Sequence, residues 1–591
     1  MLHLNKVGLF ILFFNLLNSE VLIQGSDITN NVFSSSLTDS MPAAFGDFNS
    51  DELTDIFVIR DKERTLEIFL ADEEEPLLRT PSQPLKCNFS DSQKITSVVP
   101  GDFDGDALMD VLVTVQESDD TKFTYVYIMW GGATYLNCTT KPLFKMIGQP
   151  LAIDYDQDMI VDLFGTDQDE HRTFWLFDKN RKNFPVAMRD ADNFPKLKDP
   201  HSHAFIDLNE DFTADLFLTT KENFEIWYGT GQKFIYNSSI PYPKDAKIIG
   251  QSSFIDVELR GQMDLVTPVC FDHDCKNSTL LVYSDGEWHN LQVNFKDPSN
   301  NIWNLYYKKH SMYTDTITLH SGDFNMDGYP DILATLALNS QPQSFLLENV
   351  PCDNSCGHFK RSYIVRWDAL RPYTNGTVMA AFFDFYQDGV LDIIMVKHNG
   401  TGYKSAAFKN SLDYDANFIK VMVLTGLRNK NDAMIMGRVG IKRRTYGTNL
   451  PGPCISYKTT TQEGDLRHAA SAQLPQSAHF SLNLPYSIFG LGRTPNFVDL
   501  LTVGLSSHYR QWTQIIPNSQ MVVIPWPVEN PTLWKAQLFV TPSKLILMSV
   551  AGLTTACALI TVIIGVLHWK ERQEDKKERL SESHRFHFDA M

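Results

Sequence analysis

The residues best suited to chemistry in this chain are four aspartates within residues 101–110, at Asp102, Asp104, Asp106 and Asp110. They fall at positions 1, 3, 5 and 9 of a nine-residue turn. Hard cations such as calcium are held by several oxygens, which carboxylates and backbone carbonyls supply. Position 7 is Leu108, which can offer only its carbonyl. Clustered carboxylates repel one another unless a cation lies between them. A β-branched apolar run follows, so the pattern predicts a metal-binding turn that enters a buried strand.

The same frame recurs along the chain. Its first residues are separated by intervals of 49 to 67 residues, and we number the turns loops 1 to 7. The seven starting residues are Asp47, Asp102, Asp154, Asp207, Asp256, Asp323 and Asp384. Repeats of about this length are typical of propellers, in which each blade has four strands. The sequence therefore predicts an all-β, seven-bladed β-propeller over residues 26–410.

Five of the seven loops carry a full set of oxygen ligands, and we expect structural calcium in them. The predicted ligands of loops 1, 2, 3, 4 and 6 are Asp47, Asn49, Asp51, Leu53, Asp55, Asp102, Asp104, Asp106, Leu108, Asp110, Asp154, Asp156, Asp158, Ile160, Asp162, Asp207, Asn209, Asp211, Thr213, Asp215, Asp323, Asn325, Asp327, Tyr329 and Asp331. Loop 5 has Arg260 at position 5, where an arginine can replace a metal as the local positive charge. Loop 7 has Tyr386 at position 3. The sequence leaves metal binding at these two loops open.

The loops resemble the FG-GAP repeats of integrin α-subunit propellers, including Phe45-Gly46 and Pro100-Gly101 just before two of them. The whole chain resembles the T-cell immunomodulatory protein family, which are FG-GAP proteins of the cell surface. This resemblance implies cell adhesion, modulation of T-cell responses, and a shed or secreted ectodomain as a second form. It also implies RuvB-like AAA+ ATPases and tubulin as cytosolic partners.

The two ends of the chain read as a signal and an anchor. Residues 1–25 combine Lys6 with an apolar run over 7–17, the length of a signal-peptide core, with cleavage expected between Ser19 and Ser26. Residues 545–569 carry no formal charge and are long enough to span a bilayer. Basic residues follow at once, which places the C-terminus in the cytoplasm. We expect a membrane helix over 541–569 and a cytoplasmic tail over 570–591, in a single-pass type I protein of the plasma membrane.

Between the propeller and the anchor, residues 411–540 read as a second β domain. Strand-like runs occur over 418–424 and 498–503. The stretch Phe489-Gly490-Leu491-Gly492 resembles the small β domain that follows FG-GAP-like propellers in UnbV-type proteins. We predict a β-sandwich that forms a stalk between the propeller and the membrane.

The cysteines and sequons fit an oxidising compartment. Cys270 with Cys275 and Cys352 with Cys356 favour local disulfides, although Cys270, His273, Asp274 and Cys275 could instead hold a metal. Cys87 and Cys138 lie in successive blades and could pair. Cys454 is then left free or intermolecular, and Cys557 is a free thiol in the apolar segment. The predicted glycosylation sites are Asn88, Asn137, Asn237, Asn277, Asn375 and Asn399.

Catalysis has no support in the sequence, which lacks the zinc-protease, nucleophile-elbow and phosphate-loop motifs. A net charge of −19 argues against nucleic-acid binding. Two functions remain. In the first, the chain is a non-enzymatic cell-surface glycoprotein that recognises an extracellular protein or cell-surface ligand. In the second, it is a secretory-pathway scaffold or trafficking factor that acts through its membrane segment and tail.

Overall fold

The computed structural model describes the chain apart from residues 1–24, 34–38, 189–192, 232, 310–312, 353–355, 357–358, 372, 399, 401, 412–415, 430–433, 437–441, 445, 462–463, 477–478, 494–496, 541–543 and 586–591. It divides into residues 1–539 and residues 540–591. The first unit contains the propeller and a second β domain. The second unit is dominated by one long helix. The predicted signal peptide therefore lies outside the described residues, except for Gly25.

Seven successive groups of antiparallel strands form the blades. Blade 1 contains β2 (Ser40–Gly46), β3 (Asp55–Arg60), β4 (Thr65–Ala71), β5 (Leu78–Arg79) and β6 (Leu85–Asn88). Blade 2 contains β7 (Gln93–Gly101), β8 (Asp110–Glu117), β9 (Asp120–Gly131) and β10 (Leu136–Asn137). Blade 3 contains β11 (Phe144–Ile153), β12 (Asp162–Asp167), β13 (Arg172–Phe177) and β14 (Asn183–Ala187), and blade 4 contains β15 (Ala204–Ile206), β16 (Asp215–Thr219), β17 (Asn223–Gly229) and β18 (Phe234–Pro241). Blades 2 and 3 share one continuous sheet, because β11 pairs with β9.

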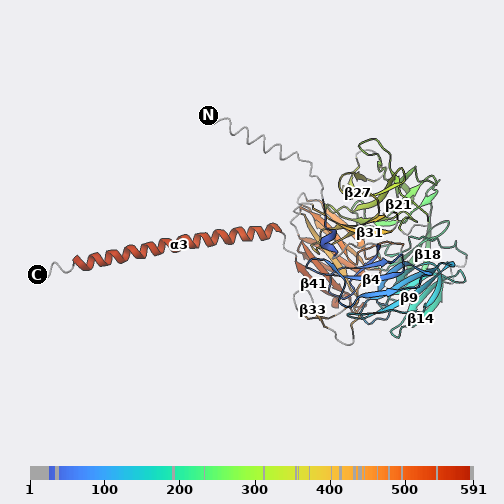
Figure 1. Cartoon of the computed structure of the whole chain (residues 1–591), viewed down its shortest axis with the longest axis horizontal. Helices are drawn as coiled ribbons and strands as arrows, with labels where there is room; N and C mark the ends of the chain where they lie inside the picture. Colours follow the sequence, from blue (N-terminus) through green and yellow to red (C-terminus); the bar gives the residue numbers. More distant parts are fainter. Residues whose placement is uncertain are drawn as a thin grey trace. The chain divides into compact units, whose positions relative to one another are not determined.

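Blades 5 to 7 complete the ring. Blade 5 contains β19 (Ile248–Ile249), β20 (Ser253–Ile255), β21 (Asp264–Cys270), β22 (Ser278–Ser284) and β23 (Glu287–Asn290). Blade 6 contains β24 (Asn304–Leu305), β25 (Leu319–Gly322), β26 (Asp331–Leu338), β27 (Gln341–Pro351) and β28 (Arg361–Arg366). Blade 7 contains β29 (Thr377–Phe383), β30 (Asp392–His398) and β31 (Tyr403–Lys409). In Figure 1 the labels β4, β9, β14, β18, β21, β27 and β31 follow one another in a ring. The predicted seven-bladed all-β propeller is confirmed.

The ring is closed by the N-terminal end of the described chain. Strand β1 (Ser26–Asp27) pairs with β31, opposite Lys409 and Phe408, and so becomes the outer strand of blade 7. The short helix α2 (Thr29–Val32) follows it. Closing a sheet ring in this way removes the open edge between the first and last blades. The strand begins directly after residue 25, where the predicted signal ends.

Each blade is positioned by its second long strand. In β8, for example, Val111, Leu112 and Val113 are fully buried, because this strand packs against neighbouring blades on both of its faces. A continuous apolar run of this kind is expected where both faces of a strand are covered. Every nine-residue loop joins the strand at the ring centre to this buried second strand. All seven loops therefore lie on the same face of the propeller.

The second β domain is a sandwich of two four-stranded sheets. Its strands are β37 (Ser487–Gly492), β32 (Asn417–Val423), β40 (Ser519–Ile524) and β41 (Lys535–Val540) in one sheet, and β36 (Leu466–Ala472), β35 (Cys454–Thr460), β38 (Val498–Leu505) and β39 (His508–Ile515) in the other. A hairpin of β33 (Met434–Met436) and β34 (Lys442–Arg444) and a 3-10 turn, η2 (Pro531–Leu533), complete the domain. Buried Ile419, Val421, Ile455, Tyr457 and Val503 fill the space between the two sheets.

The sandwich packs on the loop face of the propeller. Its predicted place as a stalk between the propeller and the membrane stays a prediction. The segment between β36 and β37 also reaches into the ring centre. There the Phe480 carbonyl lies 3.2 Å from Nε2 of His320 in β25, and the Phe480 ring lies 4.6 Å from that of Tyr313. The sequence could not reveal this docking, because it joins residues that are more than 150 positions apart.

The helix α3 (Lys544–Arg585) is long and apolar enough over Met548–Glu582 to cross a membrane. At about 1.5 Å per residue its 42 residues span about 63 Å, roughly twice the apolar thickness of a bilayer. The helix therefore continues beyond residue 569, and the predicted membrane boundary at that residue stays a prediction. The charged segment beyond it continues the helix, because it has neither glycine nor proline and is rich in glutamate, lysine and arginine.

The cysteines form three disulfides, Cys87–Cys138, Cys270–Cys275 and Cys352–Cys356. Cys270 and Cys275 are thus bonded to each other rather than arranged around a metal. Among the described residues, Cys454 and Cys557 form no disulfide. Five of the predicted glycosylation sites are exposed, namely Asn88, Asn137, Asn237, Asn277 and Asn375, and Asn399 lies outside the described residues.

Candidate metal centres

All seven loops have the same backbone conformation. Positions 4 and 6 adopt positive φ in each of them, from 52° at Gln387 to 99° at Gly328. Loop 3 has Met159 and loop 4 has Phe212 at position 6, with φ values of 67° and 65°. Side chains of this size rarely adopt this conformation unless surrounding contacts impose it. Contacts outside the local backbone therefore hold the turn in this conformation.

The aspartate at position 1 supplies part of that restraint. In every loop its Oδ2 accepts the backbone N–H of position 6, over 2.8 to 3.2 Å. The aspartate at position 9 ties the loop to its blade. In six loops its Oδ1 accepts a backbone N–H at or near the end of the third strand, over 2.7 to 2.9 Å. The end carboxylates thus fix the backbone and bring the other ligand positions together.

Loops 2 and 3 contain the densest carboxylate clusters. The oxygens of Asp102, Asp104 and Asp106 lie within 4.8 Å of one another, as do those of Asp154, Asp156 and Asp162. Asp154 is 5% exposed, and its Oδ1 has no hydrogen-bond partner among the described residues. A buried carboxylate oxygen without a partner is costly. A cation among these oxygens would satisfy it, so the residues of loop 3 fit a metal.

Loops 1, 4 and 6 replace one carboxylate by an amide. The side-chain nitrogens of Asn49, Asn209 and Asn325 each donate to the aspartate two residues later, over 2.8 to 3.3 Å. The amide oxygen then accepts the backbone N–H of that aspartate in all three loops. The three loops therefore share one arrangement, with three aspartates and one amide around the turn.

Burial and repulsion between neighbouring aspartates raise the pKa values of several loop carboxylates. Burial and neighbouring aspartates raise the pKa of Asp102 to about 8 and that of Asp323 to about 8. The same causes raise the pKa of Asp154 well above its usual range. Carboxylates in such surroundings need either protons or a nearby cation. A bound divalent cation would favour their charged forms, which oxygen ligation of calcium requires.

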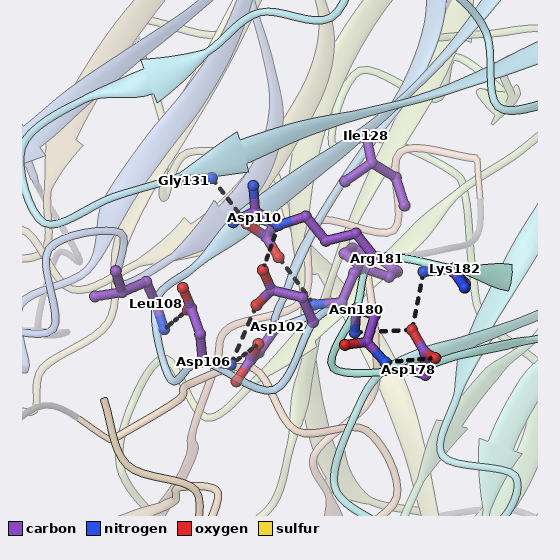
Figure 2. A network of polar contacts seen from close by, with 12 residues as sticks. Asp102, Asp106, Leu108, Asp110, Ile128, Gly131, Asp178, Asn180, Arg181 and Lys182 are labelled. Atoms are coloured by element: carbon purple, nitrogen blue, oxygen red, sulfur yellow. Dashed lines mark hydrogen bonds and ion pairs between the residues drawn. The ribbon is translucent and has the colours of Figure 1, made fainter. Parts of the chain in front are cut away.

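Loop 2 also receives a cationic side chain from blade 3. Nε of Arg181 lies 2.7 Å from Oδ2 of Asp104, and the guanidinium covers the ring of Trp130 at 4.5 Å. Figure 2 shows Arg181 reaching toward the loop from a turn that Asp178 holds through hydrogen bonds to the backbone of Asn180 and Lys182. The sequence did not predict this pair, because its members are 77 positions apart.

Loops 5 and 7 contain cations of the chain itself. In loop 5, Nη2 of Arg260 lies 2.5 Å from Oδ1 of Asp264. In loop 7, Nζ of Lys420, from strand β32 of the sandwich, lies 3.3 Å from Oδ2 of Asp384. Sequence reasoning missed Lys420. A lysine within the apolar run 418–424 is the signal that could have found it, since a lysine is rarely buried without a partner.

The sandwich contacts the loops around the ring. The Thr448 hydroxyl donates to the Asp47 carbonyl over 3.1 Å, and the Ser507 N–H donates to the Phe212 carbonyl over 3.0 Å. The sandwich also contacts the aspartate at position 1 directly in two of the loops. Backbone N–H groups of the sandwich donate to Oδ2 of two such aspartates, Ala470 to Asp256 and Gly490 to Asp323, each over 3.1 Å. The described loops therefore face the sandwich.

Comparison with known proteins agrees with this architecture. The model of an FG-GAP-like repeat matches residues 47–113, and the model described as "ITFG1, C2 domain" matches residues 445–539. The T-cell immunomodulatory proteins of Mus musculus and Homo sapiens are 41% and 40% identical, over 93% of this chain and 92% of each relative. Protein linkin of Caenorhabditis elegans is 29% identical over 93% of this chain and 95% of its own length.

The fold and the loops define an integrin-like FG-GAP propeller protein with a C-terminal β-sandwich and one helix able to span a membrane. The sequence identity to its relatives, and the share of each chain that is aligned, define the family of this protein. The chain belongs to the T-cell immunomodulatory protein family. This family is not a known enzyme family.

Proposed function

We propose that the protein is a non-enzymatic, type I glycoprotein of the plasma membrane, whose calcium-stabilised propeller recognises an extracellular protein or cell-surface ligand. The names of its relatives suggest that this recognition modulates T cells. Calcium serves as a structural ion in loops 1, 2, 3, 4 and 6. The exposed sequons agree with passage through the secretory pathway. A released ectodomain would keep the recognition surface.

The observation that carries this proposal is the covered loop face. Because the sandwich lies on the loops, a partner must bind elsewhere. Successive turns of an antiparallel meander lie at alternate ends of its strands, so the turns between the second and third strands form the opposite face. They include residues 61–64, 168–171 and 271–277. We assign ligand recognition to this free face, with the metals shaping the propeller rather than contacting the ligand.

A glycan placed on either side of the propeller tests this assignment. Asp169→Asn with His171→Thr creates a sequon in an exposed turn of the free face, whereas Asp285→Asn with Glu287→Thr creates one in an exposed turn on the loop side. Fluorescent fragments of residues 26–540 would be added to cells and measured by flow cytometry, with circular dichroism as the folding control. The first glycan should abolish cell binding and the second should leave it unchanged.

The opposite result would place the ligand on the loop side. A calcium titration adds a second arm to the experiment. Binding and the β-sheet signal should be lost over the same calcium range. Binding that is lost while the fold persists would mean that a metal contacts the ligand. A folded fragment that binds no cell type would contradict the recognition function.

The length of α3 favours a second candidate function. The helix continues for 16 residues beyond Trp569, far enough to present a cytoplasmic docking element. In this alternative the protein is a scaffold or trafficking factor that engages RuvB-like AAA+ ATPases and tubulin through residues 570–591. Surface biotinylation separates the two functions. A protein confined to internal membranes would favour the scaffold, and a surface protein would favour recognition.

A further inference from the structure

We propose that two of the seven loops use cations supplied by the chain in place of calcium: Arg260 in loop 5 and Lys420 in loop 7. Lys420 belongs to the sandwich, so it also fastens that domain to blade 7 without calcium. The contrast with the other five loops depends on the calcium role proposed above. The two side-chain cations can be tested independently of it.

Loop 7 shows most clearly a side-chain cation in the place of a metal ion. Side chains of Lys420 and Asp384 are 2% and 0% exposed, so the charges meet away from water. The Lys420 ammonium also lies 2.8 Å from Oε1 of Gln387 and 3.8 Å from the centre of the Tyr486 ring. A buried ammonium is strongly unfavourable unless it is paired and hydrogen-bonded, and these three contacts supply that compensation. The site around Lys420 therefore compensates the buried positive charge.

The turn around Lys420 has the conformation of the other loops. The N–H groups of Asp388 and Gly389 donate to the Asp384 carboxylate over 3.1 and 3.2 Å. Tyr386, at position 3, lies under the ammonium of Lys409 at 3.9 Å and offers no carboxylate. Loop 7 thus has the backbone of a metal loop with an incomplete ligand set, and the lysine supplies the missing charge.

Strand β32 is fitted closely to this loop. Gly389 has a φ of 81°, and a Cβ there would lie 2.2 Å from the ring of Phe418. Phe418 and Lys420 are two residues apart in one strand, so their side chains lie on the same face of it. One face of β32 therefore supplies both the packing surface and the cation for loop 7.

Loop 5 achieves the same result within one blade. Arg260 stands at ligand position 5 and contacts the carboxylates of Asp264 and Glu258, with Nε 3.6 Å from Glu258 Oε2. Its guanidinium also lies over the Phe359 ring at 5.4 Å. Arg181 in loop 2 is a different case, because its ion pair is with Oδ2 of Asp104, at position 3, and not with the aspartate at position 1 or 9. The Asp102, Asp104 and Asp106 oxygens stay clustered there.

A gain-of-site variant tests loop 5. Arg260→Asp gives positions 1, 3, 5, 7 and 9 of that loop an acidic or amide side chain, and Gly261 already has the left-handed φ of position 6. Calcium bound per ectodomain would be counted by equilibrium dialysis with metal analysis. Arg260→Asp should bind one more calcium than the wild type, and the matched control Arg260→Met should bind no more. Equal counts for Arg260→Asp and the wild type would overturn the assignment of loop 5.

Hydrogen exchange tests loop 7. In excess chelator, the amides of Asp388 and Gly389 should stay protected in the wild type but exchange at least tenfold faster in Lys420→Met. The matched control Lys458→Met changes an exposed lysine of the same sandwich and should leave these amides unchanged. Unchanged protection in Lys420→Met would overturn the proposal.

A second variant covers the case in which Lys420→Met does not fold. Lys420→Met combined with Asp384→Asn removes both buried charges, so it should restore secretion, which is the readout for this variant because the amide keeps only one of the two oxygens that accept the Asp388 and Gly389 N–H groups. A double variant as poorly secreted as the single one would show that the lysine acts by packing alone and would overturn its role as a cation. If the wild type binds no calcium at all, the calcium proposal fails, while these exchange results still decide the role of Lys420.

Discussion

Removal of calcium is the perturbation with the most direct prediction. Within the described residues, loops 1, 2, 3, 4 and 6 have no lysine or arginine at a ligand position, and the aspartate at position 9 of each is buried. A ligand that binds only the folded state stabilises it by RT ln(1 + [L]/Kd) for each site. Extracellular calcium modules have Kd values of about 10⁻⁴ to 10⁻³ M. At about 2 mM free calcium each site would then contribute roughly 0.6 to 1.8 kcal/mol, and five sites roughly 3 to 9 kcal/mol.

This stabilisation translates into a measurable melting shift. The ectodomain of about 515 residues has an unfolding entropy of about 1.1 kcal/mol/K, at about 2.1 cal/mol/K per residue. We therefore expect chelator to lower its melting temperature by about 3 to 8 °C, as measured by scanning calorimetry, and added calcium to restore it. The variant Asp154→Asn should reduce the shift by about one site's share, since its loop already holds an unpartnered oxygen.

The alternative is that hydrogen bonds alone hold the loops. The carboxylates at positions 1 and 9 already accept backbone N–H groups in almost every loop. In that case the melting temperature would be the same, within about 1 °C, with calcium and with chelator. That outcome would refute the metal assignment for all five loops at once.

Three further predictions concern single features. Asp106→Ala in loop 2 should lower the melting temperature more in calcium than in chelator, whereas Asp388→Ala in loop 7 should have the same effect in both; equal calcium dependence would contradict the ranking of the loops. Replacing both Cys87 and Cys138 by serine removes a cross-link over 51 positions and should cost about 4 kcal/mol in chemical denaturation; a loss below about 1 kcal/mol would show that the unfolded chain gains little freedom. In chelator the ectodomain should have a higher melting temperature at pH 6.5 than at pH 8. Burial raises the pKa of Asp102 to about 8 in the folded state. The folded state therefore holds a proton that the unfolded state releases, and this proton stabilises the folded state at the lower pH. This contribution is lost as pH rises through the folded pKa, and a higher melting temperature at pH 8 would contradict it.

The sequence by itself determined the repeating architecture. Ligand spacing within nine residues is local, so Asp102, Asp104, Asp106 and Asp110 specify one turn wherever that turn lies in space. The buried strand after each turn is equally local, because a continuous apolar run needs no knowledge of its neighbours. Repeating this unit seven times leaves a closed ring as the arrangement that covers every blade. The apolar segment near the C-terminus is readable for the same reason.

The tertiary structure decided what those loops face. Lys420 and Asp384 are 36 positions apart, and Gly490 and Asp323 are 167 positions apart, so no local pattern links them. The same holds for the N-terminal strand that completes blade 7, since its partner Phe408 lies at the far end of the propeller sequence. Such contacts depend on how whole sheets pack, which is fixed by the summed fit of many side chains. Local spacing in the sequence therefore specified the metal loops, and only packing between domains determined which face of the propeller stays free for a partner.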